Sequence, residues 1–449
     1  MLAYPELAAI RLGYGLSPLS SPPADPEALV AAIRTAGPDG DAFSVARDHL
    51  PHRSRFSDLN RSTAPDKDAQ VQALRDIVRD IGARAPRIRM ARAVGDAGGF
   101  GERLVQFWAD HFTVTDGSVF DVVTAAAFVD EAIRPHLMGR FADLMVAAET
   151  HPRMITYLDQ VTSIGPNSPA GKTGRGVNEN LAREMIELHS LGAGSGYGQR
   201  DVRQLALLLT GLTFRPNRDG ASFYNWNWAE PGSFEVLGKT YRRDRRKDEI
   251  REVIEDLAAH DATARHIARK LAVHFVSDDP PDSLVQRLAQ AFRDSRGDLP
   301  TLYLVLAEAP ELRDCFRQKL RQPFDYVVAA LRGCGFAQAD IMALEERAFR
   351  NLLLGGMFVM GQKWGSPRGP DGWPEDASAW ATAQGLAGRI DWAMRMLPKL
   401  RPDLPDPRAF MQAALGDSAS DALRWAVPKA ESPAEGLAVI LASPDFNRR

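Results

Sequence analysis

Two glutamates in one short segment are the residues of this sequence best placed to do chemistry. In "NENLAREMIELHSLG" Asn180, Glu184 and Glu187 recur at intervals of four and three residues, so a helix would place them on one face. Carboxylates grouped in this way can act as general acids or bases. His189 lies about 200° around the helix from Glu187, so it would not join the glutamates in one chelate. The di-metal motif Glu-x-x-His is missing, and metal and cofactor binding stay unknown.

A residue from another segment must therefore complete the site, and His111 is the best candidate. It belongs to "GERLVQFWADHF", where apolar residues recur every three or four positions and mark the inward face of a helix. A buried histidine beside a carboxylate can serve as a general base. We predict a catalytic group of Glu184, Glu187 and His111. The alternative is that His111 is an ordinary core residue.

Charge pairing offers a plainer explanation of the same helix. Glu179, Arg183 and Glu187 are spaced four residues apart, as in a ladder of ion pairs. Asp201 in "GYGQRDV" is suited to cap the next helix. If the segment does form a site, the flanking residues predicted to bind its ligand are Asn180, Arg183, His189 and Asp201.

The residues just before this helix come close to a phosphate-binding loop without matching one. Five residues separate Gly165 from Gly171-Lys172-Thr173, whereas the GxxxxGK[ST] pattern has four. Two prolines also remove N–H groups that would hold phosphate. We predict no nucleotide site here.

A second candidate surface is "GQKWGSPRGPDGWPEDASAW", residues 361–380. Its tryptophans stand among glycines and prolines. Aromatic side chains on a rigid loop offer a large contact area to a sugar or a peptide. We predict that Trp364 and Trp373 bind a ligand. The alternative is that they pin the loop to the body of the protein.

Helical periodicity dominates the rest of the chain, which predicts a mainly α protein. We expect one large helical domain with long Pro/Gly-rich loops, and a small β-hairpin formed by "ASFYNWNW" and "SFEVLGKTY". Residues 1–449 are expected to form a single unit. A further division would give N-terminal helices in 1–95, a motif-bearing core in 96–275 and C-terminal helices in 276–449.

Composition narrows the classes of function. The 449 residues carry a formal net charge of -3, which does not favour a nucleic acid as partner. The longest apolar runs are far too short to span a membrane. The first residues, "MLAYPELAAIRLGYG", lack the pattern of a secretory signal. We therefore expect a soluble, cytoplasmic protein.

These motifs, together with "AAIRLGYGLSP" near the start and "LASPDF" at the end, resemble the bacterial family called domain of unknown function 1800. The resemblance covers nearly the whole chain and implies a largely helical fold with no established activity. Members often accompany a second uncharacterised protein, of domain of unknown function 1501, which is similar to phosphatases and sulfatases and looks exported. The resemblance thus implies a companion of this kind and leaves export with a partner open.

Two positions depart from the family pattern. Many members read FWHNHF where this chain has Ala109, and many have a His-Asp pair where it has Ala229-Glu230. These losses make histidine-based chemistry less expected. Whether the protein is an enzyme stays uncertain. Our first expectation is a non-catalytic binding or maturation partner of the companion. The alternatives are an enzyme, of hydrolase type, using the carboxylate/His site, and a carbohydrate or cell-envelope ligand binder using the Trp-rich loops.

Overall fold

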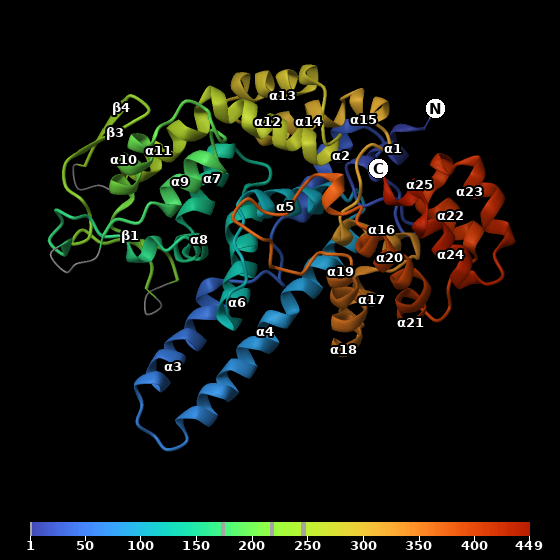
Figure 1. The fold of residues 1–449 in the computed structure, drawn as a ribbon, viewed down its shortest axis with the longest axis horizontal. Helices are drawn as coiled ribbons and strands as arrows, with labels where there is room; N and C mark the ends of the chain where they lie inside the picture. The colour runs from blue at the N-terminus through green and yellow to red at the C-terminus, as the bar shows by residue number, and fades with distance from the viewer. Residues whose placement is uncertain (1, 172–175, 216–219, 244–247) are drawn as a thin grey trace.

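Helices make up most of the protein, and the expected mainly α fold is confirmed. The computed structural model describes residues 2–171, 176–215, 220–243 and 248–449. Within these ranges the sheets are two antiparallel pairs of short strands. Among the described helices, none combines the length and apolar character needed to cross a bilayer. Figure 1 shows the arrangement of the elements.

The described residues of the first half of the chain form ten α-helices. They are α1 (Tyr4–Arg11), α2 (Pro26–Ala32), α3 (Leu50–Arg61), α4 (Lys67–Gly95), α5 (Phe100–His111), α6 (Val119–Phe128), α7 (Phe141–Thr150), α8 (Pro152–Tyr157), α9 (Asn180–Glu187) and α10 (Gln199–Leu209).

The second half is also helical. Its longer helices are α11 (Asp248–Ala259), α12 (Asp261–Phe275), α13 (Asp282–Asp294), α14 (Leu299–Ala307), α16 (Pro323–Gly333), α20 (Ala383–Asp391), α22 (Pro407–Leu415) and α24 (Pro433–Ala442).

Many helices begin at side-chain caps that the sequence supplies. Asp25 accepts a hydrogen bond from Ala28 N–H at 2.8 Å at the start of α2, and Ser432 accepts one from Glu435 N–H at 3.2 Å at the start of α24. In both cases a proline follows the cap, at the position where its missing N–H costs nothing. Local sequence therefore fixes where these helices start.

Two large apolar cores hold the fold together. The first is built by α5, α7, α9, α10 and α11 to α14. Its centre includes Trp108, whose Nε1–H donates to the Tyr303 hydroxyl at 2.7 Å. The second joins the last turns of α4 to α16, α22 and α24. The division of the chain at residues 95 and 275 stays a prediction.

Helix α4 connects these regions. It is 29 residues long, and its C-terminal half packs on α6 and α16. Its N-terminal half pairs with α3 to form an arm that projects from the body (Figure 1). Because the buried end of α4 lies against α5 and α6, side chains from all three helices meet in the interior.

The expected small β-hairpin is present, but its strands are not the two segments that were expected to pair. Strand β2 (Phe223–Tyr224) pairs with β1 (Leu212–Thr213), and β3 (Ser233–Val236) pairs with β4 (Lys239–Arg242). The segments "ASFYNWNW" and "SFEVLGKTY" therefore do not pair with each other. The second one folds back on itself at Leu237-Gly238, where both residues have positive φ, as a tight two-residue turn requires.

The segment compared with a phosphate loop connects α8 to α9. Gly165 N–H donates to Trp228 O at 2.8 Å, and Ala170 N–H donates to Asn227 O at 2.9 Å. These bonds tie the segment to the chain between β2 and β3. Lys172 and Thr173 lie outside the described residues.

Candidate ligand-binding cavity

Helix α9 presents its glutamates at the edge of the first core. Leu181 and Met185 are fully buried on its apolar face, while Glu184 and Glu187 are partly exposed. Burial raises the pKa of Glu184, with Glu187 adding to the shift. The N-terminus of α9 is held by Asn178, whose Oδ1 accepts from Asn180 N–H at 2.8 Å.

The expected charge ladder is partly formed. Arg183 and Glu179 make an ion pair at 3.6 Å, and Glu179 also pairs with Arg203 of α10 at 3.1 Å. Glu187 instead shares a hydrogen bond with the Tyr197 hydroxyl. The ladder is thus a surface link between α9 and α10, and such exposed pairs add little to stability.

His111 does not reach the glutamates of α9. It is 2% exposed, and its Nε2–H donates to the backbone oxygen of His189 at 3.2 Å. Its ring packs edge-on against Phe112. Burial lowers the pKa of His111 well below its usual range, so the ring is neutral. Among the hydrogen bonds of the described residues, none joins His111 to Glu184 or Glu187.

His189 has a different acidic partner, which the sequence analysis missed. Its Nδ1–H donates to Glu149 Oε1 at 2.7 Å, and both side chains are almost completely buried. Glu149 lies on α7, on the same inward side as Leu144 and Met145. An acid in an apolar stripe of a helix was the available signal, because a buried carboxylate needs a partner. His189 thus connects α9 to the core.

Asp201 has the capping role that was the simpler expectation. Its Oδ2 accepts from Gly198 N–H at 2.8 Å, which satisfies the first turn of α10. Its Oδ1 accepts from Leu237 N–H, also at 2.8 Å, in the turn between β3 and β4. The carboxylate is therefore fully used in structure.

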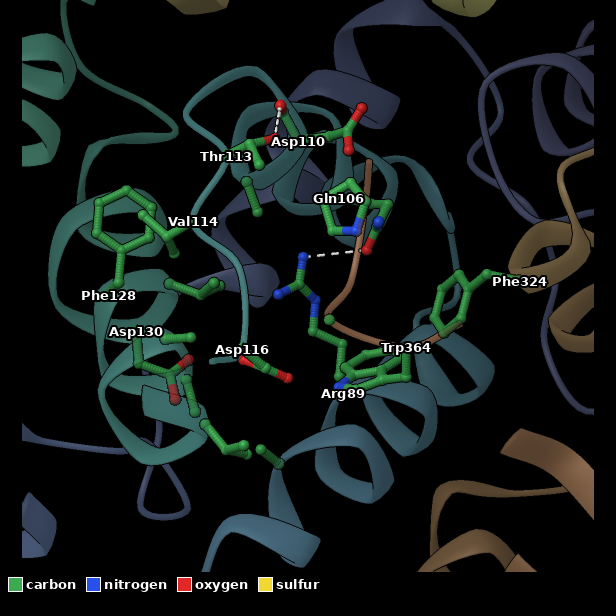
Figure 2. Close-up of a pocket in the computed structure, with 18 of the residues that line it drawn as sticks. Arg89, Gln106, Asp110, Thr113, Val114, Asp116, Phe128, Asp130, Phe324 and Trp364 are labelled. Atoms are coloured by element: carbon green, nitrogen blue, oxygen red, sulfur yellow. Dashed lines mark hydrogen bonds between the residues drawn. The ribbon is translucent and has the colours of Figure 1, made fainter. Parts of the chain in front are cut away.

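The two predicted tryptophans mark a second candidate site. Trp364 and Trp373 line a cavity of about 120 Å³ between α4, α5, α6 and the segment 361–376. Polar groups from α4, α5 and the α5–α6 connection share its wall. The wall includes Trp373 and also Arg89, Gln106, Asp110, Asp116 and Trp364, which are labelled in Figure 2.

Arg89 supplies the cation of this cavity. Its Nη2 donates to Gln106 Oε1 at 3.1 Å and makes a long contact of 3.4 Å with Val105 O. Within the described ranges, no carboxylate lies within ion-pair distance of it, and Nε and Nη1 make no hydrogen bond. Burial lowers the pKa of Arg89 to about 10, so it stays charged at neutral pH. Figure 2 shows its guanidinium reaching the middle of the cavity.

The other arginines of the wall are already paired. Arg134 forms ion pairs with Glu102 at 2.6 Å and with Asp130 at 2.9 Å. Arg92 pairs with Asp130 at 3.1 Å and also with Asp39. Their charges are therefore used to hold α4, α5 and the start of the chain together. Arg89 stands apart from this network.

Two aspartates flank the cavity. Asp110, the residue before His111, accepts from Trp373 N–H at 3.0 and 3.2 Å. Asp116 lies on the α5–α6 connection, and its N–H donates to Gly365 O at 2.8 Å. Burial raises the pKa of each carboxyl to about 7. Shifts of this size in a cavity are typical of functional sites.

Most residues of this cavity carry no recognisable signal in the sequence. Arg89 is one of several arginines in the second half of α4, just before a stretch in which all positions from Met90 to Val94 are buried, so periodicity does not single it out. Asp116 precedes a glycine and indicated only a turn. The tryptophans were predicted because they lie in a loop with an unusual composition, rich in glycine and proline.

Comparison with known proteins identifies the family and no function. The model of a family described as "Protein of unknown function (DUF1800)" matches residues 8–448. The chain belongs to the DUF1800 family. Comparison with curated proteins gave no match, and comparison with solved structures gave none either.

One of the departures from the DUF1800 pattern falls in the cavity. Ala109 lines it, so the position where many members are expected to have histidine carries only a methyl group here. Ala229 is buried, in contact range of Gly211. Within the described parts of this DUF1800 protein, no three His, Cys, Asp or Glu side chains are arranged to hold a metal ion.

Proposed function

We propose that the protein is a binding protein for a small organic carboxylate, held in the cavity by Arg89. The observation that carries this proposal is the partly buried Arg89 guanidinium, two of whose nitrogens have no hydrogen-bond partner among the described residues. Leaving such donors without partners costs free energy, which a ligand recovers. A planar carboxylate can accept two parallel hydrogen bonds from guanidinium.

Charge and size favour a carboxylate over a phosphate. The cavity has one uncompensated cation and also contains Asp110 and Asp116, which are not paired with an arginine of its wall, so a doubly charged anion would be poorly balanced. A cavity of about 150 Å³ holds benzene. At about 120 Å³ this one suits an acid of two to four carbons. Trp364, which lines the same cavity, would cover its apolar part.

Calorimetric titration with acetate, propionate and butyrate tests the proposal. We expect at least one of them to bind, and R89M to weaken it at least tenfold because a charge-assisted pair is lost. The matched control is R79M, on the same helix but in an exposed pair with Asp76. The proposal fails if none of the acids binds, or if R89M binds as well as R79M.

A second function, docking on the phosphatase/sulfatase-like companion expected from the family resemblance, is supported by an apolar surface. Helix α19 (Gly355–Val359) and helix α20 with its continuation η9 (Trp392–Met396) expose large apolar side chains side by side. Phe358 is 62% exposed and Ile390 49%. Leu386, Ile390 and Met394 recur every four residues and so share one helix face. Contiguous exposed apolar surface is typical of protein interfaces.

Binding of the purified companion to an immobilised chain tests this function. We expect the double variant F358S/I390S to lose binding at least tenfold. The matched control is W425S, which removes another exposed aromatic side chain on a different helix. Equal binding by both variants would contradict docking at this surface. The cytoplasmic location, with export beside the companion as its alternative, stays a prediction.

A further inference from the structure

Asp116 presents a second unused polar group to the cavity. Among the described residues, no hydrogen bond or ion pair is made by its carboxyl oxygens; only its backbone N–H is bonded, to Gly365 O at 2.8 Å. Burial raises the pKa of this carboxyl to about 7, although the charges of Arg153 and Lys363 act in the opposite direction. A partly buried acid without a partner is costly to keep.

The position of this carboxyl group is well defined. Gly365 has a φ of +62°, and a Cβ atom built on it would overlap the Asp116 carboxyl group. The backbone of the 361–376 segment thus lies directly against the acid. Figure 2 shows Asp116 entering the cavity from the α5–α6 connection, while Arg89 enters from α4.

The remaining charged groups of the cavity are satisfied. Asp130 is paired with Arg92 and Arg134, and Asp110 accepts the Trp373 N–H. Two charged groups are left without partners among the described residues: Arg89 on α4 and Asp116 on the α5–α6 connection. Both line the same cavity. They form no ion pair with each other within 4.0 Å. A ligand with two ends of opposite charge would satisfy both.

We infer that the ligand is a small aminocarboxylate, whose carboxylate pairs with Arg89 and whose ammonium group pairs with Asp116. This inference rests on the proposed function, since it needs the carboxylate at Arg89. The ammonium donates hydrogen bonds to the acid, and the aliphatic part between the two ends lies against apolar wall. The ligand is neutral overall, so it adds no net charge to the cavity.

Proton release is a further consequence. Around pH 7 the empty site holds Asp116 partly protonated, with Arg153, Asp121 and Lys363 as the charged groups that act on it. An ammonium ion favours the ionised carboxylate, so binding lowers its pKa and a proton leaves to the buffer. A plain carboxylate at Arg89 has no such effect on Asp116.

Matched pairs of acids test the inference on the wild-type protein. Acetate, propionate and butyrate are compared with glycine, 3-aminopropionate and 4-aminobutyrate by calorimetry at pH 7.5. We expect one amino acid to bind at least tenfold tighter than its plain partner. Its apparent enthalpy should change between buffers of different ionisation enthalpy, because a proton is released. The hydroxy acid of the same length should bind less tightly than the amine.

The variant D116N checks the contact itself. We expect it to bring the affinity ratio of amine to plain acid down to about one, because the acceptor for the ammonium group is lost. If plain acids bind and the amines bind no tighter, or a hydroxy acid binds equally well, the inference fails and the proposed function stands. If neither series binds, both fail. The wild-type comparison decides even if D116N does not fold.

Discussion

The backbone N–H of Trp373 donates to both carboxyl oxygens of Asp110, at 3.0 and 3.2 Å. This bond fastens the segment 361–376 to the C-terminal end of α5. A second bond, from Asp116 N–H to Gly365 O, fastens the same segment to the α5–α6 connection. The segment that carries the tryptophans therefore closes the cavity because two aspartate positions hold it down.

Loss of the Asp110 acceptor should free this segment. We expect D110A to be cut by trypsin at Lys363 or Arg368 at least several times faster than wild type, because local opening costs less once the anchor is gone. Limited proteolysis followed by mass spectrometry measures the rate at each site.

The variant D110N is the matched control. Its amide oxygen can still accept the Trp373 N–H, so its cleavage rate should stay close to that of wild type. Equal rates for D110A and D110N would show that this hydrogen bond does not anchor the segment.

The stability of the protein should depend on pH through Asp116. Its carboxyl has a pKa of about 7 in the folded state, against 3.8 as its ordinary value. Between these values the unfolded chain binds fewer protons than the folded one, so stability falls as pH rises from about 4 to 7. D116N removes this dependence. We expect D116N to be more stable than wild type at pH 8, by on the order of 2 kcal/mol, and equally stable near pH 4.

Urea unfolding at several pH values measures this difference. Asp110 also titrates near pH 7, but it is present in both proteins and cancels in the comparison. A difference between wild type and D116N that stays constant from pH 4 to pH 8 would contradict the prediction. A gain in stability on removing a polar group is typical of a residue kept for function.

The helical fold was predictable because its signals are local. Apolar spacing, caps such as Asp25, and prolines at helix starts all act within a few residues of one another. The strand pairing was not predictable to the same degree. Four-residue strands carry little pattern, and the choice of partner for "SFEVLGKTY" depended on the turn at Leu237-Gly238.

The site required contacts between distant parts of the chain. The sequence marked His111 as inward, but it could not show that the backbone of His189, rather than Glu184, would meet its ring. The sequence likewise could not show that Arg89 lacks an acidic partner. Whether a side chain is unpaired depends on all of its neighbours in space. These contacts depend on how distant segments pack together, so local periodicity does not predict them.

Backbone geometry at Gly365 makes a sharp prediction for the cavity. In G365A the new methyl group would overlap the Asp116 carboxyl group, and the residue would also be strained at a φ of +62°. We expect a loss of at least tenfold in carboxylate or aminocarboxylate binding, together with a loss of stability of about 2 kcal/mol. G361A is the matched control, because it has a φ of +101° but open space around its Cβ position. It should lose stability and keep binding; loss of binding in both variants would contradict the local effect.

The buried contact between His189 and Glu149 should be a major structural link. Its atoms lie 2.7 Å apart in the core, so E149A leaves a buried ring N–H without an acceptor and a cavity beside it. We expect E149A to lose roughly 3 kcal/mol of unfolding free energy, measured by urea denaturation. E187A is the matched control, since Glu187 is partly exposed on α9, and it should lose less than about 1 kcal/mol. The double variant E149A/H189A should lose less unfolding free energy than the two single variants lose together. Each single variant leaves the remaining side chain buried without its partner, and the double variant does not. Strict additivity would mean that the two side chains contribute independently, and that α9 is held to the core by its apolar face alone.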